Sequence, residues 1–308
     1  MTQESGIYAR ARQALREKWL PLNLGKTFTA EDVYRFFKLD HRTNSIEAKR
    51  AFGQALYELS RRKKNPELEQ RGRNYRVIDK TLNVIEWWDT KENDTLKINW
   101  PYGVEDNTSF GFDESILVYP GDLIVVAGEG NKGKTAFCLN FIVNNMDTMP
   151  CYYFTSEFNS AKFKDRMGKF DWVDIMKDGK PKFTLAEQSE NFQDVVQPNA
   201  INIFDWIRID EDLFLTRAVL QSIIKPLDRG IAVCVLQKRS YKKVGEGGEG
   251  TMDLASVYLT IRYDEKIASN VLRVNKVKSP GLSDPNYKEF KFSIVQSGSK
   301  FHAIEELK

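Results

Sequence analysis

Eight residues near the middle of the chain restrict its fold more than any other feature. Residues 128–135 read GEGNKGKT and satisfy the pattern G-x-x-x-x-G-K-[ST]. The apolar run LIVVA at 123–127 precedes them, and the helical run AFCLNFIVNNM at 136–146 follows. In such a turn successive backbone N–H groups can point at phosphate oxygens, and the N-terminus of the next helix attracts an anion. The segment therefore predicts a phosphate-binding loop between a strand and a helix.

The residues of this loop suit ATP and Mg²⁺. Glycines let the backbone curl around phosphate, Lys134 supplies a positive charge to the terminal phosphates, and the Thr135 hydroxyl can bind Mg²⁺. An ordinary glycine turn that caps a helix is the alternative interpretation. The residues expected to bind the nucleotide are Gly128, Glu129, Gly130, Asn131, Lys132, Gly133, Lys134, Thr135 and Ala136.

Composition is that of a globular protein. The chain has 308 residues, of which 41% are hydrophobic and 29% charged, and this length suggests about two domains. No apolar run is long enough to cross a bilayer, and the first residues lack the apolar stretch of a secretory signal. The cysteines at 138, 151 and 234 have no metal-site spacing. We expect a cytoplasmic protein without a membrane partner.

Charge is distributed unevenly along the chain. Residues 1–80 hold 18 Lys and Arg against 10 Asp and Glu, whereas residues 81–308 hold 28 against 33. A basic small module is thus joined to a mildly acidic larger one. This asymmetry favours a polyanionic partner for the first module, although a solvated basic surface is the alternative.

Helix and turn signals organise the N-terminal part. Thr29 can cap an amphipathic helix over 30–39, and a second helix is expected over 46–65, where Pro66 ends it. Two short strands then flank a turn at Gly72. The expected divisions of the chain are an N-terminal arm at 1–25, a helix-turn-helix and hairpin module at 26–80, a linker at 81–110 and a larger domain at 111–308.

The larger domain alternates short apolar runs with amphipathic stretches, which predicts an α/β fold with a mostly parallel sheet flanked by helices. Two acidic residues follow strands of this sheet. Hydrolysis of ATP needs a carboxylate near the metal and a group that orients the attacking water. Asp205 ends the run INIF and suits the Mg²⁺ shell, and Glu157 lies just after CYYFT. Solvated acids at strand ends are the alternative.

From about residue 110 to the C-terminus the chain resembles the RecA and DnaB superfamily of ATPases. PGDLIVVAGEGNKGKTAFCLNF is similar to the segment around the phosphate loop of DnaB-type helicases, and TSEF, INIFDW and VLQ follow in the family's order. The resemblance implies a RecA-like core in which Glu157 activates water and Asp205 supports the metal. It also implies that Gln237 senses the γ-phosphate.

Two further segments resemble family features. Residues 238–250, KRSYKKVGEGGEG, are similar to the RecA segment that contains its second DNA-binding loop, and LRVNKVKSP resembles the region that reaches the neighbouring subunit's ATP site. The second resemblance implies that Lys276 and Lys278 act in a homo-oligomer, either a hexameric ring or a filament. DnaB-type helicases usually carry lysine and arginine there, whereas RecA carries two lysines, as this chain does.

The N-terminal module resembles a winged helix, a fold that commonly binds duplex DNA through a helix in the major groove and that also mediates protein contacts. Together with the loop after Gln237, it supplies the cations that the resemblances assign to DNA. A solvated basic loop is the alternative for the second group. The expected DNA-binding residues are Lys49, Arg50, Arg61, Arg62, Lys63, Lys64, Arg71, Arg73, Lys238, Arg239, Lys242 and Lys243.

These patterns favour a DNA-associated ATP hydrolase, acting as a helicase or translocase or as a recombinase-like filament, with replication or recombination proteins as further partners. An ATP-gated replication initiator, loader or regulator is the alternative from another class. A small-molecule kinase would also use a phosphate loop. It gives no account of Gln237 followed by a basic loop, nor of the basic N-terminal module.

Overall fold

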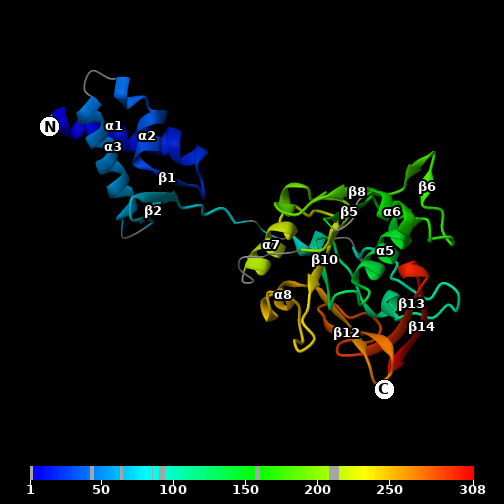
Figure 1. The fold of residues 1–308 in the computed structure, drawn as a ribbon. Helices are drawn as coiled ribbons and strands as arrows, with labels where there is room; N and C mark the ends of the chain where they lie inside the picture. The colour runs from blue at the N-terminus through cyan, green and yellow to red at the C-terminus, as the bar shows by residue number, and fades with distance from the viewer. Residues whose placement is uncertain are drawn as a thin grey trace. The chain divides into compact units, whose positions relative to one another are not determined.

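The structure is a computed structural model in which the chain forms two compact units. They span Met1–Asp89 and Thr90–Lys308, and their elements are labelled in Figure 1. Each unit has its own hydrophobic core. The residues that the structure describes are 3–41, 45–62, 65–82, 84, 86–89, 94–156, 160–207 and 215–308.

The first unit begins with helix α1 (Gln3–Ala14), which continues into a π-helical turn (Leu15–Trp19) and a 3-10 turn (Leu20–Leu22). This segment packs against α3 (Ser45–Ser60). Its apolar residues recur every fourth position, so they lie along one face and are buried. The buried ones are Ala11, Leu15 and Trp19. The segment expected to be an arm is therefore part of the core of this unit.

The rest of the first unit follows the predicted order of helix, helix and hairpin. Its other elements are β1 (Thr27–Thr29), α2 (Ala30–Phe36), a 3-10 turn (Leu39–His41), β2 (Leu68–Arg71) and β3 (Asn74–Val77). The strands form an antiparallel sheet in the order β1-β3-β2. The predicted cap at Thr29 is confirmed, because its hydroxyl accepts the Asp32 N–H while its own N–H donates to the Asp32 carboxylate.

Helix α3 ends five residues before the predicted boundary. Its apolar stripe runs through Phe52, Leu56 and Leu59, which are all buried. Beyond Leu59 the sequence offers polar and basic residues without another apolar position up to Pro66. Because packing of an apolar face supplies most of a helix's stability, the helix ends where that stripe ends.

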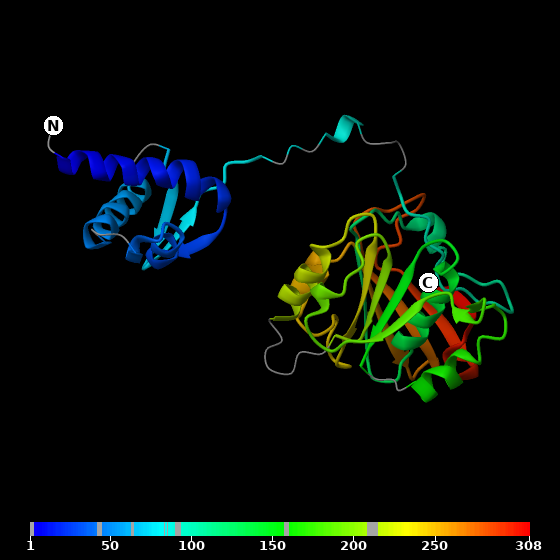
Figure 2. The same cartoon turned by 90° about the horizontal axis from the view of Figure 1, so that it is seen from above.

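The second unit is built on one large sheet. Its strands are β4 (Leu123–Gly128), β5 (Cys151–Thr155), β8 (Thr184–Glu187), β9 (Ile201–Asp205), β10 (Ile231–Gln237), β11 (Val257–Asp264), β12 (Ser269–Val277), β13 (Glu289–Val295) and β14 (Lys300–Leu307). In the described part of the chain their order is β14-β13-β12-β11-β4-β10-β9-β5-β8. Neighbours from β11 to β8 are parallel, and β12, β13 and β14 add an antiparallel extension. Figure 2 shows this extension in orange and red.

Helices cover both faces of the sheet, as Figure 1 shows for α5 and α6 on one side and α7 and α8 on the other. The helices are α4 (Phe112–Ser115), α5 (Lys134–Asn145), α6 (Ser160–Met167), α7 (Leu215–Ile224) and α8 (Glu249–Leu254). Shorter elements of this unit are 3-10 turns at Phe192–Asp194 and Gln296–Gly298, and a hairpin of β6 (Met176–Lys177) and β7 (Lys180–Pro181). A further 3-10 turn, Trp87–Asp89, ends the first unit. No helix among the described residues is long and apolar enough to span a membrane.

Strand β4 shows why the sheet is buried on both faces. Ile124 and Val126 belong to the hydrophobic cluster around α5, whereas Val125 and Ala127 belong to the cluster around α7. Successive side chains of a strand point to opposite faces, so a strand between two helical layers must be apolar at every position. At β4, polar chemistry is therefore confined to the end of the strand and the loop that follows it.

The expected linker contributes its second half to the second unit. Trp100 is buried and packs edge-to-face on Phe112 and Phe141, with ring centroids 5.3 and 5.5 Å apart. The Asn99 backbone N–H and carbonyl both bond the Asn145 side chain. These contacts place residues near 100 in the core, whereas the linker had been expected to extend to residue 110.

Gly230 lies just before β10, where the chain comes close to the backbone that leads into β9. A Cβ at this position would lie 2.6 Å from the Ala200 nitrogen and 2.7 Å from the Pro198 oxygen, both backbone atoms. We expect Gly230→Ala to destabilise the unit by about 1–3 kcal/mol, because backbone must move to accept the methyl group. Gly168→Ala is the matched control, since its Cβ makes ordinary contacts of 3.4 and 3.5 Å. Equal thermal unfolding of the two variants would contradict this packing.

Candidate nucleotide site

The predicted phosphate loop joins β4 to α5 in a tight curl. Asn131 has φ 55° and Gly133 has φ 105°, both in the left-handed region that turns the chain back on itself. A Cβ at Gly128 would lie 2.8 Å from the Ile261 carbonyl oxygen, and one at Gly133 would collide with the Ile294 side chain. Gly128 is therefore required by its close approach to the backbone of β11, and Gly133 by its left-handed conformation.

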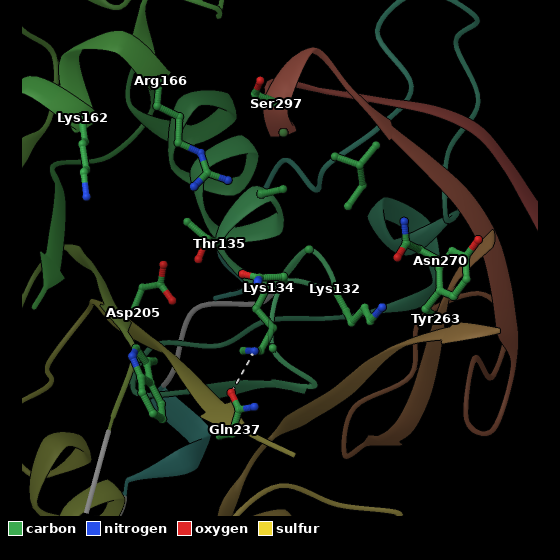
Figure 3. Close-up of a pocket in the computed structure, with 17 residues that line it drawn as sticks. Lys132, Lys134, Thr135, Lys162, Arg166, Asp205, Gln237, Tyr263, Asn270 and Ser297 are labelled. Carbon is green, nitrogen blue, oxygen red and sulfur yellow. Dashed lines mark hydrogen bonds between the residues drawn. The ribbon is translucent and has the colours of Figure 1, made fainter. Parts of the chain in front are cut away.

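Lys134 lies inside this loop, with its side chain 8% exposed. Its Nζ donates to the Glu129 carbonyl oxygen at 2.7 Å and to the Gln237 Oε1 at 3.2 Å. The dashed line in Figure 3 marks the second bond. Gln237 ends β10 directly beside Gly128 in the parallel register. The sheet thus brings together two predicted site residues that are far apart in sequence.

Asp205 lies at the end of β9 and is 2% exposed. The Tyr153 hydroxyl donates to its Oδ2 at 2.5 Å, and its carboxyl also hydrogen-bonds the Thr135 side chain. Burial raises the pKa of Asp205, and these two bonds together with the charges of Lys134 and Arg166 oppose that rise. The two residues predicted to bind the metal therefore lie together.

This pair of oxygen donors fits Mg²⁺. The Thr135 hydroxyl and the Asp205 carboxylate are hard ligands, and Mg²⁺ usually takes only one or two protein groups beside phosphate and water. Among the described residues there is no group of three or more His, Cys, Asp or Glu that could hold another kind of metal ion. The donor set therefore suits a cation that is shared with a bound phosphate.

Two cations on α6 also face this site, and the sequence reasoning missed them. Lys162 and Arg166 line the same cavity, and Figure 3 shows them extending from α6 on the side of Thr135 and Asp205. A Cβ at Gly298 would lie 2.9 Å from Arg166 Nη2, so this glycine leaves room for the guanidinium. Their spacing of four residues on the helix after β5 was the available signal, because it places both on one face.

The cavity that joins these groups has a volume of about 930 Å³, which is within the range of small-molecule and cofactor sites. Tyr263 and Asn270 lie at its other end, and Ile294 also lines the cavity. The Lys132 ammonium lies 4.8 Å from the centroid of the Tyr263 ring. Cations at one end suit phosphates, and an aromatic ring with an amide and an aliphatic side chain suits a heterocyclic base at the other.

Of the other predicted site residues, Lys276 and Lys278 do not line this cavity. Glu157 lies outside the described residues; β5 ends at Thr155, which pairs with Asp205. Lys276 Nζ donates to the Met252 and Asp253 carbonyl oxygens at 2.8 and 2.7 Å, and Lys278 Nζ donates to the Leu254 carbonyl oxygen at 3.2 Å. Both lysines therefore bond the C-terminal carbonyls of α8, and their role at a neighbouring subunit stays a prediction.

The predicted DNA-binding loop divides into a buried base and an exposed tip. Lys238 is 6% exposed, lies 3.7 Å from the Glu129 carboxylate, and has its pKa lowered by burial. Its assignment to DNA is therefore corrected, because a buried ammonium cannot meet a phosphate backbone. Arg239, Lys242 and Lys243 are exposed, as that role requires.

Three of the predicted DNA-binding cations of the first unit are paired within that unit. Lys49 pairs with Asp40 at 2.5 Å, Arg62 with Glu67 at 2.8 Å and Arg71 with Glu69 at 2.7 Å. Within the described residues no ion pair involves Arg50, Arg61 or Arg73, all of which are exposed. Lys63 and Lys64 lie outside the described residues.

The comparisons with known proteins support the fold. No protein-family profile matches the chain, and no curated protein matches it in sequence. Among solved structures it is similar to a KaiC-like protein from the hyperthermophilic archaeon Pyrococcus horikoshii OT3, with a TM-score of 0.50 and 15% identity. The match covers 68% of this chain and 98% of that one. The predicted RecA-like α/β fold is thereby confirmed.

Asp205→Asn should stabilise the nucleotide-free protein while removing Mg²⁺-dependent nucleotide binding. The folded-state pKa of Asp205 is raised, so the stability linked to it is present at low pH and is lost as pH rises through that pKa. An amide has no charge to desolvate, so the variant should melt about 2–4 °C higher at neutral pH for each 1 kcal/mol gained, and lose this advantage near pH 4. A lower melting temperature of Asp205→Asn than of the unaltered chain at neutral pH would contradict the assignment. So would a rise in the variant's melting temperature on addition of Mg²⁺-ATP that equals the rise of the unaltered chain.

Arg166→Ala should weaken ATP binding by about tenfold or more, because a guanidinium–phosphate hydrogen bond would be lost. Lys164→Ala is the matched control: this lysine lies on the same helix, is exposed, and does not line the cavity. Titration with a fluorescent ATP analogue measures both variants. Equal affinity of the two would show that Arg166 does not contact the nucleotide.

Proposed function

We propose that this chain is an ATP hydrolase of the RecA type that couples ATP to DNA binding in a homo-oligomer. One observation carries the proposal. Lys134 follows β4, Asp205 ends β9 and Gln237 ends β10, and all three line one cavity at one edge of the sheet. A phosphate loop, a metal-supporting carboxylate and an amide that meets the loop lysine are the groups that ATP hydrolysis of this type requires.

The chemistry follows from the positions of these groups. Lys134 and Arg166 would hold the terminal phosphates and offset the charge that develops during transfer. Bound Mg²⁺ would add charge stabilisation, held by Thr135 and Asp205. The water oxygen attacks the terminal phosphorus, the bond to the ADP oxygen breaks, and Glu157 accepts the water proton.

Gln237 links this reaction to the loop that follows it. Its side chain bonds Lys134, while its backbone carbonyl accepts the Glu246 N–H at 2.8 Å. A γ-phosphate competes for the Lys134 ammonium, which frees the Gln237 amide to bind the phosphate itself. The Gln237 side chain therefore bonds Lys134 without nucleotide and the γ-phosphate with it. Because the Gln237 backbone holds both ends of the loop 238–246, this change in bonding is transmitted to the loop, which carries the exposed cations proposed to contact DNA.

The first unit is proposed to be a winged helix that contacts DNA. The order α1, β1, α2, α3, β2, β3 and the three-stranded antiparallel sheet support this proposal. Arg50 on α3, Arg61 beyond its end and Arg73 in the β2–β3 turn are exposed, and none of them takes part in an ion pair among the described residues. Three phosphate contacts of this kind would supplement DNA binding by the loop 238–246 of the second unit.

Lys276 and Lys278 are proposed to complete a neighbour's site after they leave the carbonyls of α8. Closed rings seen by electron microscopy with ATP and DNA would favour a helicase or translocase, and filaments a recombinase-like activity. We further propose a cytoplasmic location and replication or recombination proteins as partners.

An ATP-gated initiator, loader or regulator is the second candidate. It is favoured by one observation: Lys276 and Lys278 both donate to carbonyl oxygens of their own chain. A site whose trans-acting lysines are held in cis would turn over slowly and respond chiefly to assembly.

Lys134→Ala should reduce ATP turnover by at least about a hundredfold, because the buried ammonium is the loop's charge for the terminal phosphates. Lys225→Ala, an exposed position at the end of α7 outside the cavity, is the control and should keep wild-type turnover. Phosphate release by the purified full-length chain measures both. Unchanged turnover in Lys134→Ala with intact folding would overturn the proposed function.

A further inference from the structure

A second cavity of the larger unit lies at the far end of α5 from the phosphate loop. Val143 and Asn144, in the last turn of that helix, line it, whereas Lys134 in the first turn lines the nucleotide cavity. Its volume is about 600 Å³, which is within the range of small-molecule sites. None of the described residues lines both cavities. The proposed ATP chemistry therefore makes no use of this second cavity.

Two aromatic residues in contact with each other line this cavity. The rings of Tyr102 and Trp172 meet edge to face with their centroids 6.3 Å apart, and the Trp172 indole N–H donates to the Ser299 carbonyl oxygen at 3.0 Å. Tyr102 is 37% exposed. Among the described residues no Lys or Arg lies over either ring. The face of an aromatic ring attracts a cation, and the described part of the chain supplies none to this pair.

Two amide side chains offer hydrogen-bond acceptors to the cavity. Asn99 Nδ2 donates to the Asn144 carbonyl oxygen at 3.0 Å, and Asn144 Nδ2 donates to the Trp100 carbonyl oxygen at 3.0 Å. These bonds fix both amides through their donor sides. No hydrogen bond to either amide oxygen occurs among the described residues. Because the oxygen is the acceptor of an amide group, both side chains suit a ligand that is rich in N–H donors.

The charge of the lining side chains is negative. Asp113 and Asp147 line the cavity together with no Lys or Arg from the described part of the chain. Lys182 pairs with Asp147 at 3.1 Å, but no ion pair among the described residues involves Asp113. The C-terminal end of α5 adds the negative end of its dipole, and its last turn holds no basic residue. The cavity is therefore complementary to a positive charge.

We propose that this cavity is a binding site for a guanidinium group. A guanidinium is planar, carries five N–H donors and no acceptor, and stacks on aromatic rings. The Asp113 carboxylate can take two of these donors and the Asn99 and Asn144 oxygens can take others, while the plane of the group stacks on Tyr102. A metal ion is not favoured, because no group of three or more His, Cys, Asp or Glu gathers among the described residues.

The same chemistry is available from a free guanidinium compound and from an arginine side chain of another protein. Isothermal titration calorimetry of the full-length chain with N-acetyl-argininamide measures the binding itself. N-acetyl-lysinamide has the same charge and caps but no planar fork, and it should bind at least about tenfold more weakly. A glycine pentapeptide with one central arginine separates the two sources. Tighter binding of this peptide than of N-acetyl-argininamide would identify an arginine of a protein segment, and equal binding a small guanidinium compound.

Substitutions locate the binding at this cavity. Asp113→Asn should weaken N-acetyl-argininamide binding by about 10- to 100-fold, because hydrogen bonds to a charged partner are lost. Glu114→Gln is the matched control: it removes the same charge from the next residue of α4, which is exposed and does not line the cavity, and it should bind normally. Tyr102→Ala should weaken binding by about 2- to 5-fold through loss of the ring.

Three results would overturn this inference. The first is the absence of saturable binding of N-acetyl-argininamide up to about 10 mM, where even one weakly held cation is detected. The second is equal affinity for the lysine probe, which would exclude recognition of the planar group without any substitution in the protein. The third is equal affinity of the folded Asp113→Asn and Glu114→Gln variants, which would place the binding elsewhere on the molecule.

Discussion

The central sheet of the second unit is covered by helices on both faces, and this constraint determines where its chemistry can occur. Every residue of β4 is buried, so no position of β4 can carry a solvent-exposed polar group. Charged and amide side chains are displaced to the carboxyl ends of the strands, where parallel strands deliver them to one edge. The insertion of β10 between β4 and β9 then sets Gln237 between the phosphate loop and Asp205. The nucleotide site follows from burial and strand order together.

Burial of charged side chains at the nucleotide site is unfavourable for the folding free energy of the protein. Asp205 and Lys134 are both almost fully buried, and burial raises the pKa of Asp205 despite two hydrogen bonds to its carboxyl. A carboxylate in this position is tolerated because Tyr153, Thr135 and nearby cations partly replace the water it has lost. Mg²⁺ and phosphate would complete that replacement. The electrostatic strain of the nucleotide-free site is thus a source of affinity for its ligand, which is how perturbed carboxylates often mark functional sites.

Local patterns predicted much of this structure. The phosphate loop and its flanking strand and helix depend on contiguous residues, and Asp205 could be placed because it ends an apolar run. Gln237 followed from the resemblance of VLQ to the family's strand that ends in glutamine. Residues whose role depends on packing between distant segments could not be placed. Lys238 looked like its exposed neighbours until Glu129 was seen beside it, and Arg166 faces the cavity only because of how α6 lies on the sheet. Two misses left a signal: the spacing of Leu15 and Trp19 in the supposed arm, and the four-residue spacing of Lys162 and Arg166 on α6.

The coupling of ATP to DNA is the central claim, and it is tested most directly by steady-state ATP hydrolysis of the purified full-length chain with and without single-stranded DNA at low and high salt. The account predicts that DNA raises turnover at low salt and that the increase fades as salt rises, because phosphate contacts weaken when counterions compete. Turnover that is the same with and without DNA at both salt concentrations would contradict coupling and would instead support an ATP-gated assembly switch.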